Sequence, residues 1–262
     1  MALKKLYNPI HGVMRIAGFM SGTGSNLIKI IDHSEKLKAE RGNSPYEVVA
    51  VFSDVCDCNA NFIGKEKDLP VITRDLAGFY AKRGLSSTIY KENPKIREEF
   101  DKETRDALSP YFVNAIALGG YMSKVTYPLL NEYLIVNVHP ADLSIMSDGK
   151  RKFKGEKTVF KAIQAQEKEI RSTTHIVDPK IDNGEILMIS SPIEVKLEDG
   201  FDVSNDETIK FLAKHFQDRL KKFGDHVIFP RTMEYIADGR FAKDEKDNLY
   251  FDDNPIPQGI RL

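Results

Sequence analysis

The stretch that decides the fold runs from Arg15 to Asn26 and reads RIAGFMSGTGSN. Its first half is a mostly apolar run typical of a buried strand, and the residues after Asn26 have apolar side chains at the 3.6-residue spacing of a helix. The amide groups of a first helical turn lack intrahelical acceptors and the helix dipole is positive there, so this glycine-rich turn is suited to binding a phosphate. The alternative is an ordinary turn in which Ser25 or Asn26 caps the helix.

Strand and helix patterns alternate along the rest of the chain. Strands are predicted at 46–53, 70–73, 112–122, 133–139, 172–178 and 185–197, and helices at 27–40, 76–84, 95–108, 158–169 and 204–239. This alternation predicts an α/β fold with a doubly wound, mostly parallel Rossmann-like sheet flanked by helices, and with ligands at the carboxyl ends of its strands. We expect residues 1–14 to form an N-terminal extension and residues 15–262 to form one domain.

The composition and charge of the chain limit the kinds of molecule that it is expected to bind. The 262 residues have a net charge of −1, with 41% hydrophobic and 29% charged side chains, as in soluble globular proteins. A near-neutral chain is a poor general binder of nucleic acid, and no apolar stretch is long enough to span a bilayer or to form a signal peptide. Cys56 and Cys58 are the two cysteines of the chain and read as reduced thiols. We therefore expect a cytoplasmic monomer or homodimer that acts on small molecules without a metal, a nucleic-acid partner or a membrane.

The segment LIVNVHP contains the first candidate catalytic pair. Asn137 and His139 are two apart on a predicted strand, so their side chains point to one face, and Pro140 ends the strand. A carboxamide beside an imidazole can stabilise a developing oxyanion and transfer a proton. The same two residues could instead satisfy loop backbone.

The segment THIVDPKIDNGEIL supplies carboxylates. Asp178 and Asp182 flank a turn around Pro179, and Asn183-Gly184 leads the chain into the next strand. A carboxylate near His139 would raise the pKa of that imidazole and orient it. Taken alone, Asp182 is an ordinary turn residue, and His175 is a further histidine that could reach the site.

These segments together carry a family resemblance. The order S-G-x-G-S-N-L, G-G-Y-M, V-N-V-H-P and H-I-V-D-x-x-I-D-N-G, with the ending ADGRF…NLYFDDNPIPQGI, resembles the folate-dependent formyltransferases over roughly residues 15–260. The G-S-N-L element resembles the corresponding element of the branch whose acceptor is glycinamide ribonucleotide, a molecule that carries a phosphate. The resemblance implies transfer of the formyl group of 10-formyltetrahydrofolate to the amine of 5′-phosphoribosylglycinamide in purine biosynthesis, with no metal.

The resemblance also implies roles for particular residues. Asn137 and His139 would stabilise the tetrahedral intermediate, with Asp182 raising the pKa of His139 and keeping it charged. The ribonucleotide would contact Gly24, Ser25, Asn26 and Asp225, where the family has a glutamate in place of Asp225. The cofactor would contact Arg97, Met122, Ser123, Lys124, Val125, Asn137, Asp178, Pro179, Lys180 and Ile181.

The segment after Pro140 departs from the family, whose S-L-L-P and short glycine turn are replaced here by ADLSIMSDGKRKFKG. Its basic cluster reads as a solvated loop, and residues 149–157 could also close on the anionic glutamate tail of the folate. The departure leaves two other acceptors open: an amino-sugar nucleotide, or water in a formyltetrahydrofolate deformylase. A dinucleotide-dependent oxidoreductase is disfavoured because Leu27 stands where a third glycine belongs, and a silent nucleotide-binding paralogue because Asn137, His139 and Asp182 are all present.

Overall fold

The computed structural model describes residues 3–86, 94–196 and 205–262. The chain forms two compact units, one of Tyr7–Asn137 and the other of Met1–Leu6 with Val138–Leu262. The main sheet has eight strands in the hydrogen-bonded order β16-β11-β10-β6-β5-β2-β3-β4. The boundary between the units falls inside β6 (Leu134–His139), and each unit is described separately below.

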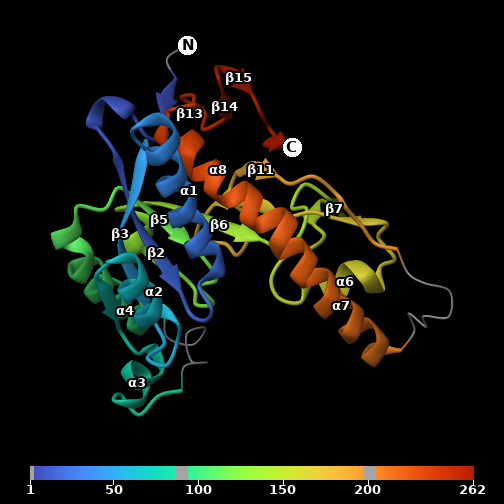
Figure 1. Cartoon of the computed structure of the whole chain (residues 1–262). Coiled ribbons are helices and arrows are strands. Elements are labelled where there is room, and N and C mark those ends of the chain that lie inside the picture. The colour runs from blue at the N-terminus through green and yellow to red at the C-terminus, as the bar shows by residue number, and fades with distance from the viewer. Residues whose placement is uncertain (1–2, 87–93, 197–204) are drawn as a thin grey trace. The chain divides into compact units, whose positions relative to one another are not determined.

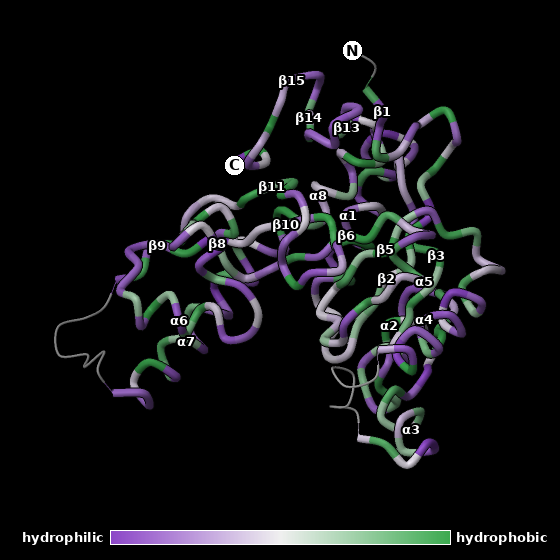
Figure 2. Tube along the Cα trace, turned by 180° about the vertical axis from the view of Figure 1, so that it is seen from behind, coloured by the Kyte–Doolittle hydropathy of each residue, from purple (hydrophilic) through white to green (hydrophobic). Residues whose placement is uncertain are grey.

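The first unit, Tyr7–Asn137, has a parallel βαβ architecture. Its strands are β2 (Met14–Met20), β3 (Tyr46–Ser53), β4 (Val71–Thr73), β5 (Ala115–Leu118) and most of β6, and each neighbouring pair is parallel. Its helices are α1 (Ser25–Arg41), α2 (Ala60–Lys67), α3 (Leu76–Ala81), α4 (Pro94–Leu108) and α5 (Tyr127–Leu130), with 3-10 turns at Pro9–His11 and Ser109–Tyr111. All four residues of β5 are buried, as expected of a central parallel strand covered on both faces. Figure 2 shows β3 and β5 as largely hydrophobic traces.

Helix α1 packs on this sheet through one apolar face. Leu27, Ile30, Ile31 and Leu37 are buried, and the helix ends where Gly42 takes the left-handed conformation, φ +82°. Its start lies close to the loop after β5, because a Cβ placed on Gly119 would lie only 3.1 Å from the backbone nitrogen of Leu27. Glycine at position 119 therefore permits the approach of α1 to the carboxyl end of β5.

The second unit, Met1–Leu6 with Val138–Leu262, contains shorter strands. They are β1 (Lys4–Lys5), β7 (Met146–Ser147), β8 (Lys150–Arg151), β9 (Glu169–Ile170), β10 (Thr173–Ile176), β11 (Ile186–Ile189), β12 (Ile193–Glu194), β13 (Phe241–Lys243), β14 (Leu249–Phe251), β15 (Asn254–Pro255) and β16 (Ile260–Arg261). Strand β11 pairs antiparallel with β10 and parallel with β16, so the sheet is mostly parallel, as predicted. The helices are α6 (Thr158–Gln164), α7 (Asp206–Leu220) and α8 (His226–Ala237), and α7 continues into α8 through a π-helical turn at Lys221–Asp225, as Figure 1 shows.

Several predicted elements end earlier or divide, and three of them do so for a clear physical reason. The helix predicted to reach 169 stops at Gln164, because Gln166 is left-handed at φ +54° and the amides of Gln166 and Glu167 turn back to the helix. The strand predicted over 185–197 breaks after Ile189, and the residues beyond Pro192 pair with β9 instead. The helix predicted over 204–239 contains the π-helical turn, and the proline at position 230 of α8 lacks the N–H that would continue the ladder.

The fold class predicted from the alternation is confirmed, and the strand expected over 46–53 matches β3 residue for residue. Within the predicted extension, Lys4–Lys5 forms β1, which pairs antiparallel with β13. Met1, Ala2 and the end residues Leu197 and Ser204 of two predicted elements lie outside the described residues.

Candidate active site

The glycine-rich loop (Ser21–Asn26) joins β2 to α1 in the first unit, as predicted. Gly24 caps the helix in the left-handed conformation at φ +67°, and a Cβ there would lie 2.5 Å from Ile63 Cδ1 and 2.7 Å from Met20 Sδ. Glycine is therefore required both by the backbone conformation and by the space. The first turn of α1 supplies amide groups suited to an anion, but Asn26 is 7% exposed, so its side chain lies inside the fold.

A buried carboxylate ties this loop to the loop that follows β5. Asp54, immediately after β3, accepts a hydrogen bond from Ser21 Oγ at 2.6 Å and another from Ser123 Oγ. Ser21 Oγ in turn accepts from the backbone nitrogen of Met122 at 3.0 Å. The ribonucleotide and cofactor segments predicted in this unit are therefore held together by Asp54, a role that the sequence analysis missed. Its position directly after a buried parallel strand was the available signal.

Arg97, predicted to contact the cofactor, is buried at 2% exposure. Its guanidinium donates to Asp101 Oδ1 at 2.8 Å and to the hydroxyl of Tyr121 at 2.9 Å. Asp101 also accepts from the backbone nitrogen and the hydroxyl of Thr126, at 2.7 Å each. Arg97 thus contacts one end of the segment 121–126 directly, at Tyr121, and the other end through Asp101, which binds Thr126. Within that segment, Met122 is 78% exposed and Val125 is buried, whereas Ser123 and Lys124 are half-buried.

In the second unit, His139 ends β6 and is 4% exposed. Its Nδ1 lies 3.5 Å from Asp182 Oδ2, and its Nε2 lies 2.9 Å from the carbonyl oxygen of Phe153. The other carboxylate oxygen of Asp182 lies 3.5 Å from His175 Nε2, and the backbone nitrogen of Gly155 donates to Asp182 Oδ2 at 2.7 Å. Asp182 therefore lies within ion-pair distance of two histidines, His139 and His175.

The net pKa of His139 is shifted down from its ordinary value of 6.5, which corrects the expectation that Asp182 keeps this residue charged. Burial is the largest cause and disfavours the imidazolium; Asp182 raises the pKa as predicted, but its contribution is smaller. The positive charge of Arg151 and the neighbouring His175 lower the pKa further. For Asp182, burial alone would raise the pKa, but hydrogen bonding to His175, the charge of His139 and the Gly155 amide together lower it.

The loop that carries Asp182 is ordered by its own polar groups. Asp178 accepts from the backbone nitrogen of Lys180 at 2.9 Å and from Asn183 Nδ2 at 3.1 Å. Asp182 itself is left-handed, with φ +49°, and a Cβ on Gly184 would clash with the carbonyl of Ile176. At the tip of the loop, Ile181 is 61% exposed and Lys180 is also exposed, so both side chains are accessible to a ligand.

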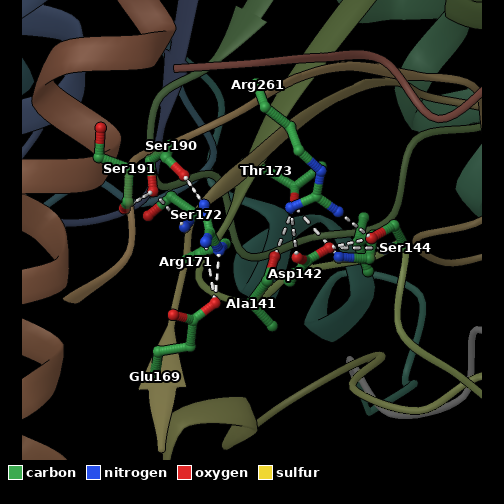
Figure 3. A network of polar contacts seen from close by, with 11 residues as sticks. Ala141, Asp142, Ser144, Glu169, Arg171, Ser172, Thr173, Ser190, Ser191 and Arg261 are labelled. Carbon is green, nitrogen blue, oxygen red and sulfur yellow. Dashed lines mark hydrogen bonds and ion pairs between the residues drawn. The ribbon is translucent and has the colours of Figure 1, made fainter. Parts of the chain in front are cut away.

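Polar contacts hold the turn that follows His139 (Figure 3). Thr173 Oγ1 donates to the carbonyl of Ala141 at 2.6 Å and accepts from the backbone nitrogen of Leu143 at 3.1 Å. Arg261, on β16, donates to Asp142 Oδ2 at 3.1 Å and to Ser144 Oγ at 2.7 Å. The acidic residue that departs from the family pattern thus pairs with the C-terminal strand.

The basic segment is more ordered than a solvated loop. Residues 146–151 form the β7–β8 hairpin, and the half-buried Arg151 donates to the carbonyl oxygens of Asp182 and Gly184 at 2.8 and 2.9 Å. Lys152 pairs with Glu167 at 2.6 Å. Arg151 and Lys152 are therefore already engaged within the protein, which the local sequence pattern did not reveal because both partners lie elsewhere in the chain.

Asp225, predicted to contact the ribonucleotide, lies in the π-helical turn and is 5% exposed. Ser172 Oγ donates to its Oδ1 at 2.5 Å. Such turns often occur at functional sites.

Among residues 3–86, 94–196 and 205–262 there is no group of three or more His, Cys, Asp or Glu side chains that could hold a metal ion, nor a helix long and apolar enough to cross a membrane.

The chain is similar to known proteins over most of its length. The phosphoribosylglycinamide formyltransferase of Haemophilus influenzae is 25% identical over 247 residues, which cover 93% of this chain and 96% of that protein. The human trifunctional purine biosynthetic protein adenosine-3 is 25% identical over 237 residues, which cover 90% of this chain but 19% of that protein.

Solved structures show the same fold. The phosphoribosylglycinamide formyltransferase of Coxiella burnetii matches with a TM-score of 0.68 at 22% identity, over 95% of this chain and 99% of that one. Glycinamide ribonucleotide transformylase 1 of Symbiobacterium toebii matches with a TM-score of 0.65 at 24% identity, over 91% and 94% of the two chains. The model of the formyl transferase family matches residues 14–211, more than half of the sequence, and the chain therefore belongs to the formyl transferase family.

Proposed function

We propose that this protein transfers the formyl group of 10-formyltetrahydrofolate to the amine of 5′-phosphoribosylglycinamide, a step of purine biosynthesis. The family membership supports formyl transfer, and the names of the relatives support this acceptor. The observation that carries the proposal is the His139–Asp182 pair at the end of β6, because it supplies a group able to move a proton. We further propose that residues 15–262 work as one catalytic domain after an extension of residues 1–14.

In the proposed reaction, the amine nitrogen attacks the formyl carbon, and the bond from that carbon to the folate nitrogen breaks. One proton leaves the attacking amine, and one proton is delivered to the folate nitrogen. Asn137 would donate a hydrogen bond to the oxyanion of the tetrahedral intermediate, an interaction worth about 3–4 kcal/mol in other oxyanion holes.

His139 would begin this reaction as a neutral imidazole, because burial lowers its pKa. It can therefore accept a proton at Nε2, a step that requires Nε2 to exchange its contact with the carbonyl oxygen of Phe153. Negative charge developing on the formyl oxygen would raise the pKa of the ring in the intermediate, and Asp182 would stabilise the imidazolium that forms. This sequence of states replaces the expectation of a permanently charged histidine.

The substrate roles follow the resemblance. We propose that the glycine-rich loop binds the acceptor phosphate through Gly24, Ser25 and Asn26, where backbone groups contribute most because the Asn26 side chain is buried. Asp225 would bind the ribonucleotide through its carboxylate, whose Oδ1 accepts from Ser172 Oγ in this structure.

The cofactor roles divide into direct and indirect ones. The exposed Met122 and Ile181 would contact the folate directly, together with Ser123, Lys124, Val125, Asn137, Asp178, Pro179 and Lys180. Arg97 would act through Tyr121 because its guanidinium is buried. The substrates are small molecules, and we place the reaction in the cytoplasm, in a monomer or homodimer.

The deciding experiment measures formyl transfer from 10-formyltetrahydrofolate to 5′-phosphoribosylglycinamide by the wild type and by His139→Asn. We expect turnover by the wild type and a loss of about 10²- to 10⁴-fold in the variant. The exposed His215→Asn serves as the control with unchanged turnover. Cofactor consumption without the ribonucleotide would instead favour a deformylase, and turnover only with an amino-sugar nucleotide would replace the acceptor.

A further inference from the structure

Arg151 reaches from the β7–β8 hairpin to the turn that carries Asp182. Its two terminal nitrogens donate separately to the carbonyl oxygens of Asp182 and Gly184, at 2.8 and 2.9 Å. The rigid fork of a guanidinium suits two acceptors held side by side, whereas an ammonium is a single point charge. Arg151 therefore constrains the backbone on both sides of Asn183.

Asp182 needs such a constraint because its backbone is left-handed at φ +49° without being glycine. A residue in that region persists where the surroundings over-determine it. The segment 146–155 also holds the carboxylate, through the Gly155 amide at 2.7 Å, and holds His139 through the carbonyl of Phe153 at 2.9 Å. One segment thus positions both partners of the pair, and Arg151 supplies its link to the Asp182 backbone.

The charge of Arg151 has a second consequence. The titratable and charged groups that act on His139 are Asp182 on the turn, His175 on β10 and Arg151 on β8. Asp182 favours the imidazolium, whereas Arg151 disfavours it. Two substitutions separate the effect of the two-pronged hydrogen bond from the effect of the positive charge. Arg151→Lys keeps the charge but loses the two-pronged contact, and Arg151→Gln loses both.

We propose, on the basis of the function proposed above, that Arg151 is a positioning residue for formyl transfer, which fixes the backbone of Asp182 and thereby the carboxylate against His139. The β7–β8 hairpin then contributes to catalysis by positioning Asp182 through Arg151. The remaining basic side chains of the segment are not required for this role.

The test compares Arg151→Lys and Arg151→Gln with Lys168→Gln, an exposed control with the same charge change in the same unit. Steady-state kinetics over a range of pH and NMR titration of the His139 ring are the two readouts. We expect kcat to fall by about 10- to 100-fold in both Arg151 variants with each KM changed by less than about twofold, since a displaced catalytic group costs rate more than affinity.

The titration separates positioning from a general loss of structure. The pKa of His139 should fall in Arg151→Lys, where the positive charge stays but the Asp182 carboxylate is no longer held against the ring. It should stay near that of the wild type in Lys168→Gln, and in Arg151→Gln the loss of the positive charge opposes the fall. All variants should be folded by circular dichroism. An Arg151→Lys protein with unchanged kcat, or with an unchanged His139 titration, would overturn the inference. If the wild type does not use 5′-phosphoribosylglycinamide, the proposed acceptor fails, but the titration still tests Arg151.

Discussion

Asp182 Oδ2 lies 3.5 Å from Nδ1 of His139, at an ion-pair distance and beyond that of a short hydrogen bond. The attraction raises the pKa of His139, but burial outweighs it and the net shift is downward. His139 is therefore neutral near neutral pH in the free protein, and it lies beside a carboxylate that stabilises the charged ring once a proton is gained. This arrangement suits a group that must gain and release a proton in one turnover.

Replacing Asp182 should impair that cycle. In Asp182→Asn the carboxylate contribution is lost, so the pKa of His139 should fall further and kcat should drop by about 10²-fold or more. NMR titration of the ring and the pH profile of kcat measure the two effects. A variant whose His139 titrates as in the wild type would contradict the assigned electrostatic role.

The lowered pKa of His139 also predicts how stability depends on pH. Because the unfolded chain binds a proton at this residue near its ordinary pKa of 6.5, while the folded protein resists protonation, the contribution is complete above about 6.5 and is lost as the pH falls toward the folded pKa. Urea unfolding between pH 8 and pH 5 should therefore show a smaller decline in His139→Gln than in the wild type. An identical decline in both proteins would show that other groups cause it.

The glycine-rich loop offers a matched pair of substitutions. Gly24→Ala places a Cβ against Ile63 and Met20 in a left-handed backbone, so the free energy of unfolding should fall by about 1–3 kcal/mol. Gly22→Ala is the control, because a Cβ there meets no atom within 4 Å. Chemical denaturation measures both, and equal stability of the two variants would refute the steric argument.

Asp54 should link acceptor and cofactor binding. Asp54→Ala removes the shared acceptor of Ser21 and Ser123, which should cost about 1–3 kcal/mol of stability and raise the KM of both substrates. Asp54→Asn keeps one acceptor oxygen, so its stability and its KM values should lie between those of the wild type and of Asp54→Ala. The exposed Asp57→Ala is the control. An Asp54→Ala protein as stable as the control would contradict the link.

Local pattern was sufficient for the strands of the first unit and for α1, α3 and α4, but the short helices α2 and α5 were not predicted. The apolar runs at β2, β3 and β5 and the periodicity of α1 are properties of neighbouring residues, so their order could be read directly and predicted the parallel sheet. The second unit was harder, because two-residue strands such as β7 and β8 have no periodicity to detect. These two strands pair with each other across a short turn, whereas the contact of the Arg151 side chain with the Asp182 backbone joins segments remote in sequence.

The chemical types at the candidate site were likewise readable from the chain: an asparagine and a histidine at a strand end, a glycine-rich turn, and carboxylates in a later turn. Their electrostatic state was not. Whether His139 is charged depends on how much water is excluded around it. The buried guanidinium of Arg97 likewise donates to Asp101 and Tyr121, which lie elsewhere in the chain. The sequence therefore specifies which chemical groups are available to the site. Packing decides how far each group is desolvated and which distant segments meet. The downward pKa shift of His139 and the contact of Arg151 with the Asp182 backbone for this reason arise only in the folded protein.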